Sequence, residues 1–245
     1  MAEQYYYGHG KLLLTGEYFV LDGAKALALP TKLGQKMFVR YRPSSSPKLV
    51  WKSIDSNGKV WFEARFETWH LNCISNNEEQ KETIVLQKLL RQARLLNIHF
   101  LREDCDIYVE TVLEFDRFWG LGSSSTLIYN IAQWAYVSPF ELQNQTFRGS
   151  GYDIACAQSM GPITYVKTKK GPNWETVEFN PHFKDKLFFI YLNKKQNSAE
   201  SVRFYKELSI PNKTAIINEI SGLSEALINC VNIYEFDEVI KRHEE

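Results

Sequence analysis

Short apolar runs and alternating apolar and charged residues predict β-strands separated by turns over the first 180 residues. The end of the run at 60–66 alternates aromatic or apolar side chains with charged ones, as expected for a strand with one exposed face. Asp22-Gly23 is a strong turn signal, and we expect Pro30 to end the strand that follows it. The expected strands cover residues 11–16, 24–29, 36–42, 48–54, 59–66, 106–113, 163–167 and 174–179.

Apolar residues at three-to-four spacing predict helices between and after these strands. One amphipathic helix is expected to run from about Val85 to Asn97. Ser138 is expected to cap a short helix, because Pro139 suits its first position and Glu141 follows three residues after the cap. Further helices are expected over residues 126–137, 152–160, 198–208, 213–229 and from 235 to the end.

The segment around residue 180 predicts a change of domain. Residues 180–185 have the composition of a linker, and the continuous apolar run 187–192 predicts a buried strand directly after it. We therefore expect one domain over 1–180 and the start of a second over 181–245. The last predicted helix has no stop signal, so the second domain is expected to be truncated.

Composition and charge favour a globular protein of the cytoplasm. Hydrophobic residues make up 44% of the 245 residues, and 29 Lys and Arg balance 29 Asp and Glu. A net charge of zero disfavours binding to nucleic acid or to an anionic membrane surface. The four cysteines form no closely spaced pair, which argues against a zinc site and a disulfide framework. The first residues lack a secretory signal, and no apolar run reaches the roughly 18 residues of a membrane span.

The most informative stretch of the chain is a run of glycines and serines that follows the strand expected at 106–113. Two glycines allow a close backbone approach to a ligand, and the serines fall in the first turn of a helix, where free N–H groups attract phosphate. A serine hydroxyl can also bind Mg²⁺. The alternative interpretation is an ordinary Gly/Ser connection with a serine cap. The candidate phosphate-binding residues are Gly120, Leu121, Gly122, Ser123, Ser124 and Ser125.

Three segments together resemble the GHMP kinases, the family of galactokinase, homoserine kinase, mevalonate kinase and phosphomevalonate kinase. Residues 8–23 are similar to the family's N-terminal P-G-K-x-x-L-x-G-E-(H/Y) motif. Residues 120–125 resemble its G-L-G-S-S phosphate loop, and residues 149–155 resemble its S-G-x-D segment. Their order and spacing match the family. The form of the third segment, with Gln145 upstream, looks most like phosphomevalonate kinases.

The sequence also departs from the family pattern. His9 stands where the family usually has proline, and Trp119 precedes the phosphate loop where a proline-led segment is usual. The acidic Mg²⁺ ligand of mevalonate kinases has no clear counterpart, and Gln145 lies near its place. The C-terminal glycine-rich motif is absent, and we expect it beyond residue 245 of a longer parent protein.

The resemblance implies an α+β fold of two domains, a mixed-sheet N-terminal domain and a ferredoxin-like C-terminal domain that is incomplete, with the site in the cleft between them. It implies that ATP binds along residues 120–125 and that Ser124 helps to bind Mg²⁺. Asp153 matches the proposed general base, and Lys11 is expected to stabilise the transferred phosphoryl group. Taken singly, Asp153 could also be an ordinary helix-start residue and Lys11 a solvated strand lysine.

The acceptor is expected to be a small anionic molecule. The candidate substrate-binding residues are His9, Glu17, Arg148, Ser150 and Gly151. Lys194 and Lys195 are further candidates for a phosphate or carboxylate, although surface charge is the simpler interpretation of each cation.

The resulting prediction is an ATP-dependent kinase that acts on mevalonate or phosphomevalonate. A sugar or homoserine kinase of the same family and a non-catalytic nucleotide-binding relative are the alternatives, and a homodimer is left open.

Overall fold

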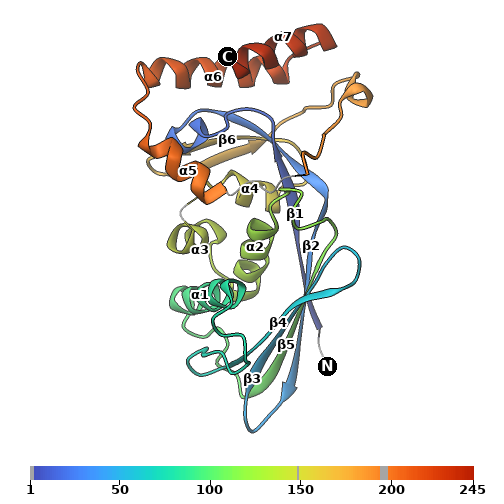
Figure 1. Cartoon of the computed structure of the whole chain (residues 1–245), viewed down its shortest axis with the longest axis vertical. Coiled ribbons are helices and arrows are strands. Elements are labelled where there is room, and N and C mark those ends of the chain that lie inside the picture. Colours follow the sequence, from blue (N-terminus) through green and yellow to red (C-terminus); the bar gives the residue numbers. More distant parts are fainter. Residues whose placement is uncertain (1–2, 148, 194–197) are drawn as a thin grey trace. The chain divides into compact units, whose positions relative to one another are not determined.

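The computed structural model describes residues 3–147, 149–193 and 198–245 and has an α+β fold (Figure 1). The chain packs into two compact units. The first contains residues up to 10, 32–117 and 121–149, and the second contains 11–31, 118–120 and 150–245. The predicted α+β class is confirmed in this coarse form. The predicted domain boundary at residue 180 and the ferredoxin-like second domain stay predictions.

The first unit is built on a sheet with the strand order β4-β3-β5-β2. Strands β3 and β5 are parallel, and the other neighbours in this order are antiparallel. Burial alternates along the strands, as expected for a sheet with one covered face. In β3, for example, Leu49, Trp51 and Ser53 are buried while the residues between them are more exposed. The strands are β1 (Glu3–Leu13), which pairs with β2 (Ala26–Pro43), β3 (Lys48–Ile54), β4 (Val60–Glu67) and β5 (Cys105–Leu113).

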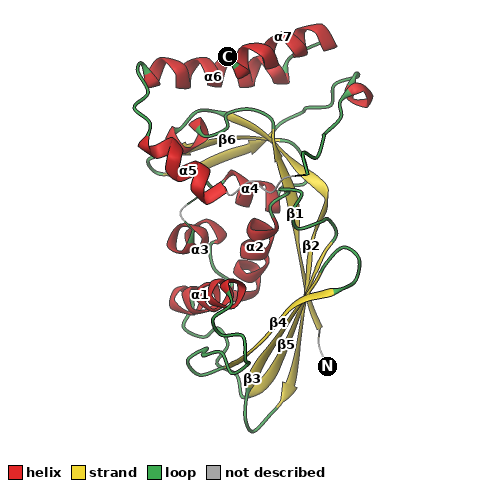
Figure 2. Cartoon of the chain, in the orientation of Figure 1, coloured by secondary structure: helices red, strands yellow, loops and turns green. Residues whose placement is uncertain are grey.

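Three helices of the first unit pack against one another on the same side of this sheet (Figure 2). They are α1 (Lys81–Leu96), α2 (Ser123–Ala135) and α3 (Pro139–Thr146). Each buries apolar residues such as Leu89 of α1 and Ile131 of α2. The expected cap of α3 is confirmed, since the Ser138 hydroxyl accepts a 3.3 Å hydrogen bond from the backbone N–H of Glu141.

In the described residues, the second unit combines a small sheet with four helices. The first residues of β2 pair with β6 (Ile163–Thr168), which pairs in turn with β7 (Gly171–Thr176), and both pairings are antiparallel. Helix α4 (Tyr152–Gln158) contacts β6. Two short 3-10 turns cover Phe19–Asp22 and Lys184–Lys186. The remaining helices are α5 (Ser198–Glu207), α6 (Lys213–Ile228) and α7 (Ile233–Glu244), the last two lying side by side (Figure 1).

The prediction that Pro30 ends a strand is wrong. Strand β2 continues through Pro30 to residue 43. Its residues 26–28 pair with β6 and its residues 35–43 pair with β5, so Pro30 lies between the two ladders. Neither of these two ladders includes position 30, so the missing N–H group of proline costs them no hydrogen bond.

The predicted buried strand at 187–192 is also wrong. These residues belong to no helix or strand, and their side chains are exposed, with Phe188 and Ile190 each 81% accessible. A continuous apolar run predicts burial only where another element packs on it, and among the described residues no strand pairs with this one. None of the described helices is both long enough and apolar enough to cross a membrane.

Candidate functional site

The glycine and serine stretch forms a loop that leads into α2. Gly120 and Gly122 adopt φ values of +75° and +86°, in the left-handed region that favours glycine. Gly122 is also the N-cap residue of α2, and no side chain of the described residues caps the helix. The first N–H groups of a helix have no partner within the helix, so an uncapped start leaves them available to an anion.

The serine hydroxyls at this helix start differ in their surroundings. The Ser125 hydroxyl donates a 2.8 Å hydrogen bond to the carbonyl oxygen of Gly122, which turns it back toward the loop. Ser125 is buried, Ser123 is half-buried, and Ser124 is exposed. Within residues 123–125, Ser124 is therefore the hydroxyl best placed to meet a ligand.

The residues at this helix start could bind a Mg²⁺ ion only if phosphate groups supplied further ligands. The described residues contain no group of three or more His, Cys, Asp or Glu side chains that could hold a metal by themselves. Mg²⁺ in nucleotide sites takes few protein ligands and completes its shell with phosphate oxygens and water. The exposed hydroxyl of Ser124 is suited to supply such a ligand.

Close packing fixes the start of α2 against β1 and β2. A Cβ atom on Gly8 would lie 3.1 Å from the carbonyl oxygen of Thr126, so only glycine lets β1 approach the helix backbone so closely. The Thr126 hydroxyl donates to the side-chain oxygen of Gln35 at 2.9 Å. The side-chain amide of Asn130 donates to the backbone oxygen of Gln35 at 2.9 Å. These contacts give the helix a fixed position within the first unit.

Glu114 has a half-buried carboxylate and directly follows β5, at the start of the loop that leads to α2. Its carboxylate accepts hydrogen bonds from the Tyr7 hydroxyl at 2.7 Å and the Gly34 N–H at 3.1 Å, and it pairs with Lys36 at 2.8 Å. Burial raises the pKa of Glu114, but these donors outweigh burial and hold the pKa below its ordinary value. The sequence analysis missed Glu114, for which a charged residue directly after a strand was the available signal.

Lys11 and the start of α4 form a second group of candidate residues, within the second unit. Gly151 has a φ of +100° and precedes α4, whose first two residues are Tyr152 and Asp153. The Lys11 ammonium nitrogen lies 5.5 Å from the centre of the Tyr152 ring. Lys11 and Asp153 also interact electrostatically. The predicted pair of Lys11 and Asp153 is therefore brought together, with Tyr152 as an unpredicted third member.

The charges in this second group are set by burial and by mutual contacts. Burial lowers the pKa of Lys11, but contacts with Tyr152 and Asp153 outweigh it and the pKa is raised, so the amine stays protonated. Burial raises the pKa of Tyr152, which keeps the phenol neutral. Burial and Asp153 raise the pKa of Cys156 to about 12, so this thiol is a poor nucleophile.

The other predicted residues have varied positions. His9 lies in the first unit. Its ring is edge-on to that of Tyr7, with 4.9 Å between the ring centres. Glu17 is exposed in the turn after β1. The backbone oxygen of Ser150 accepts a 2.5 Å hydrogen bond from the Tyr165 hydroxyl, which fixes the approach to α4. Arg148, like Lys194 and Lys195, lies outside the described residues.

The C-terminal helices contact residues 15–22, the later half of the motif at residues 8–23. The sequence did not predict these contacts. The Gly16 N–H donates to the His243 ring at 2.9 Å, and the Thr15 and Ser224 hydroxyls lie 2.6 Å apart. The Tyr205 hydroxyl donates to Asp22 at 2.6 Å. Residues from α5, α6 and α7 thus fix the segment that follows Lys11, and no spacing in the sequence links such distant residues.

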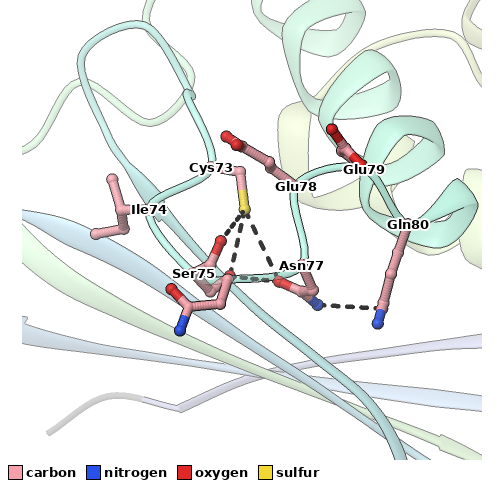
Figure 3. Close-up of a pocket in the computed structure, with 8 residues that line it drawn as sticks. Cys73, Ile74, Ser75, Asn77, Glu78, Glu79 and Gln80 are labelled. Carbon is pink, nitrogen blue, oxygen red and sulfur yellow. Dashed lines mark hydrogen bonds between the residues drawn. The ribbon is translucent and has the colours of Figure 1, made fainter.

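A separate cavity of about 430 Å³ lies in the first unit, lined by residues 73–80 (Figure 3). The Ser75 hydroxyl donates to the Asn77 side-chain oxygen at 2.6 Å, and the Cys73 sulfur lies 3.2 Å from the Ser75 hydroxyl. These contacts describe a hydrogen-bonded loop (Figure 3). Among the sequence-predicted site residues that the structure describes, none lines this cavity.

No protein-family model and no curated protein matches this sequence. Solved structures do match in fold. Methanococcus jannaschii mevalonate kinase has a TM-score of 0.66 and 13% identity, over 99% of this chain and 77% of that one. Streptococcus pneumoniae phosphomevalonate kinase, solved with phosphomevalonate and AMPPNP, has a TM-score of 0.65 and 13% identity, over 97% and 78%. Staphylococcus aureus mevalonate diphosphate decarboxylase has a TM-score of 0.55 and 14% identity, over 98% and 71%. The chain therefore has a fold similar to that of the GHMP kinases.

Proposed function

We propose that this chain is an ATP-dependent small-molecule kinase that transfers the γ-phosphoryl group to mevalonate or phosphomevalonate. The observation that carries the proposal is the uncapped start of α2, where left-handed glycines precede an exposed Ser124. Backbone N–H groups and the helix dipole at such a start are suited to the phosphates of a nucleotide. The fold similarity to a phosphomevalonate kinase solved with AMPPNP supports this assignment.

In this proposal Lys11 and Asp153 act on the transferred group. Phosphoryl transfer depends mainly on alignment and on charge neutralisation. Lys11 stays protonated beside Tyr152 and Asp153, so it can neutralise charge on the γ-phosphoryl group. Asp153 accepts the proton of an acceptor hydroxyl, or orients a phosphate acceptor together with Lys11. Ser124 would hold Mg²⁺ together with the phosphates, and the bound ion would supply further charge neutralisation.

The acceptor is assigned as a small anion because Lys11, half-buried and protonated, favours a negatively charged partner. His9, Glu17, Ser150, Gly151 and Arg148 stay the proposed acceptor-binding residues. Of these, Ser150 and Gly151 lie next to Asp153 in the chain, and they shape the acceptor side of the site through their backbone.

Turnover by the purified chain tests the proposal. ADP release would be measured with ATP and Mg²⁺ in the presence of mevalonate, phosphomevalonate, homoserine or galactose, each compared with ATP alone. We expect release that depends on mevalonate or phosphomevalonate. Release with galactose or homoserine instead would identify a different acceptor class. AMPPNP binding without release for any acceptor would indicate a non-catalytic nucleotide-binding protein.

A further inference from the structure

Residues 16–19 form a strained turn in the second unit, shortly after β1. Tyr18 has φ and ψ values of 60° and −47°, and the Phe19 N–H donates a 2.7 Å hydrogen bond to the carbonyl oxygen of Glu17. A hydrogen bond that spans one central residue with positive φ defines the strained form of the γ-turn, which is rare. Such a backbone persists only where surrounding contacts hold it. The exposed Glu17, a proposed acceptor-binding residue, lies in this turn.

Contacts from the C-terminal helices hold the turn at two places. The Tyr18 ring stacks on that of Tyr205 in α5, with 5.6 Å between the ring centres, and the Tyr205 hydroxyl donates to Asp22 at 2.6 Å. At the start of the turn, the Gly16 N–H donates a 2.9 Å hydrogen bond to Nε2 of His243 in α7. The His243 side chain is only 8% exposed, so this hydrogen bond is shielded from water. Its loss would remove one of the contacts that hold the strained backbone.

The His243 ring makes two contacts that only its neutral form satisfies together. Nδ1 lies 3.1 Å from a carboxylate oxygen of Glu244, and it must carry the proton there because a carboxylate only accepts hydrogen bonds. Nε2 then has a free lone pair, which accepts from the Gly16 N–H. Protonation of the ring would place a second proton on Nε2, facing another donor. The contact with Gly16 would be lost, whereas the contact with Glu244 would stay.

The other charged groups around α7 do not replace this relation. The elements that contact α7 are the turn itself, α6, and the segment around Phe183, whose ring meets that of Phe236. Their exposed groups are Glu17, His182, Lys184, Asp185 and Lys186, and their paired groups are Glu219 with Arg242, Glu225 with Lys25, and Lys213 with Asp22. On α7 itself, Lys241 pairs with Asp237. Among the described residues, Glu244 is therefore the charged partner of the ring.

We propose that His243 is a positioning residue for the turn at residues 16–19, and that it holds this turn only while its ring is neutral. Through the turn it fixes the direction of Glu17. Its part in acceptor binding rests on the proposed kinase function, whereas its contact with Gly16 does not. Histidine changes charge between about pH 5 and 8, so the turn is held at the upper end of this range and released at the lower end.

The test compares the wild-type chain with His243→Gln and His243→Leu. Glutamine keeps an acceptor and does not titrate, whereas leucine removes the acceptor, and both favour a helix. Hydrogen–deuterium exchange of a peptide covering residues 14–19 reports protection of the Gly16 N–H, with all chains compared at the same pH. We expect wild-type protection to match that of His243→Gln at about pH 8. At about pH 5.5 it should fall several-fold toward that of His243→Leu, as expected for the loss of one hydrogen bond.

A second histidine makes the exchange result specific. His99→Gln removes an exposed imidazole of the first unit and should show the same pH dependence as the wild type. If His243→Gln lost protection at low pH as the wild type does, another group would be responsible and the proposal would be overturned. Equal protection of His243→Leu and wild type at about pH 8 would also contradict it.

Kinetics then test the link to the kinase. His243→Leu is expected to raise the KM for the acceptor about threefold to tenfold at pH 8 and to change the KM for ATP less, because Glu17 is assigned to the acceptor. His243→Gln should restore the wild-type KM. Equal changes in both KM values would exclude a specific role in acceptor binding. Absence of turnover in the wild type would instead defeat the kinase function and leave the exchange result to decide the contact of His243 with Gly16.

Discussion

At the scale of single residues, the candidate site depends on where hydroxyls and charges are left for a ligand. Ser125 turns its hydroxyl toward the Gly122 carbonyl, while the neighbouring Ser124 is exposed. Lys11 keeps its charge in spite of burial because Tyr152 and Asp153 lie beside it. Identical residue types in one short segment therefore have different surroundings, which depend on their local contacts.

Replacement of Ser124 by alanine is expected to weaken binding of the Mg²⁺–ATP complex about tenfold, because one hydrogen bond or ligand to a charged group is lost. Isothermal titration with AMPPNP and Mg²⁺ would measure the change. Ser56→Ala, at an exposed turn of the first unit, is the matched control and should bind as the wild type does. Equal affinity for Ser124→Ala and wild type would exclude Ser124 from the site.

At the scale of elements, the position of α2 depends on glycines in the neighbouring strands β1 and β2. A Cβ atom on Gly34 would lie 2.3 Å from the carbonyl oxygen of Gly8, and one on Gly8 would lie 3.1 Å from that of Thr126. Two strands and the start of a helix are therefore in contact through backbone atoms. Rigid backbone contacts of this kind leave no side chain that could move aside.

Gly8→Ala is expected to destabilise the chain by about 1–3 kcal/mol, because the added methyl group would meet the backbone of α2. Gly222→Ala in α6 is the matched control, since nothing lies within 4 Å of its added Cβ atom. That change should stabilise the chain by about 0.5–1 kcal/mol, because alanine favours a helix interior. Urea unfolding would measure both. A neutral Gly8→Ala would contradict the close packing described here.

The same elements show how far sequence reasoning extends. Alternation predicted β4 and capping predicted the start of α3, because those signals are local. The predictions that a strand ends at Pro30 and that residues 187–192 form a buried strand were wrong. In both places the structure depends on which other strand lies alongside, and a local pattern does not contain that information. The proximity of Lys11 to Asp153 was inferred through the family resemblance. The contacts of Tyr152 and Glu114 needed coordinates, since their partners are distant in the sequence.

At the scale of the whole molecule, the chain has a fold similar to that of solved mevalonate and phosphomevalonate kinases, at 13% identity. Fold alone does not determine activity, since a decarboxylase shares it. The functional assignment therefore depends on the residues, namely the serines at the start of α2 in the first unit and Lys11, Tyr152 and Asp153 in the second.

The most direct test of the kinase assignment is to separate binding from turnover with Asp153→Asn. This variant keeps the size of the side chain and removes its charge. We predict AMPPNP affinity close to that of the wild type and a loss of acceptor-dependent ADP release of at least about a hundredfold, as expected for a lost general base. Glu79→Gln, an exposed carboxylate in the first unit, should leave both values unchanged. Wild-type turnover by Asp153→Asn would contradict the account.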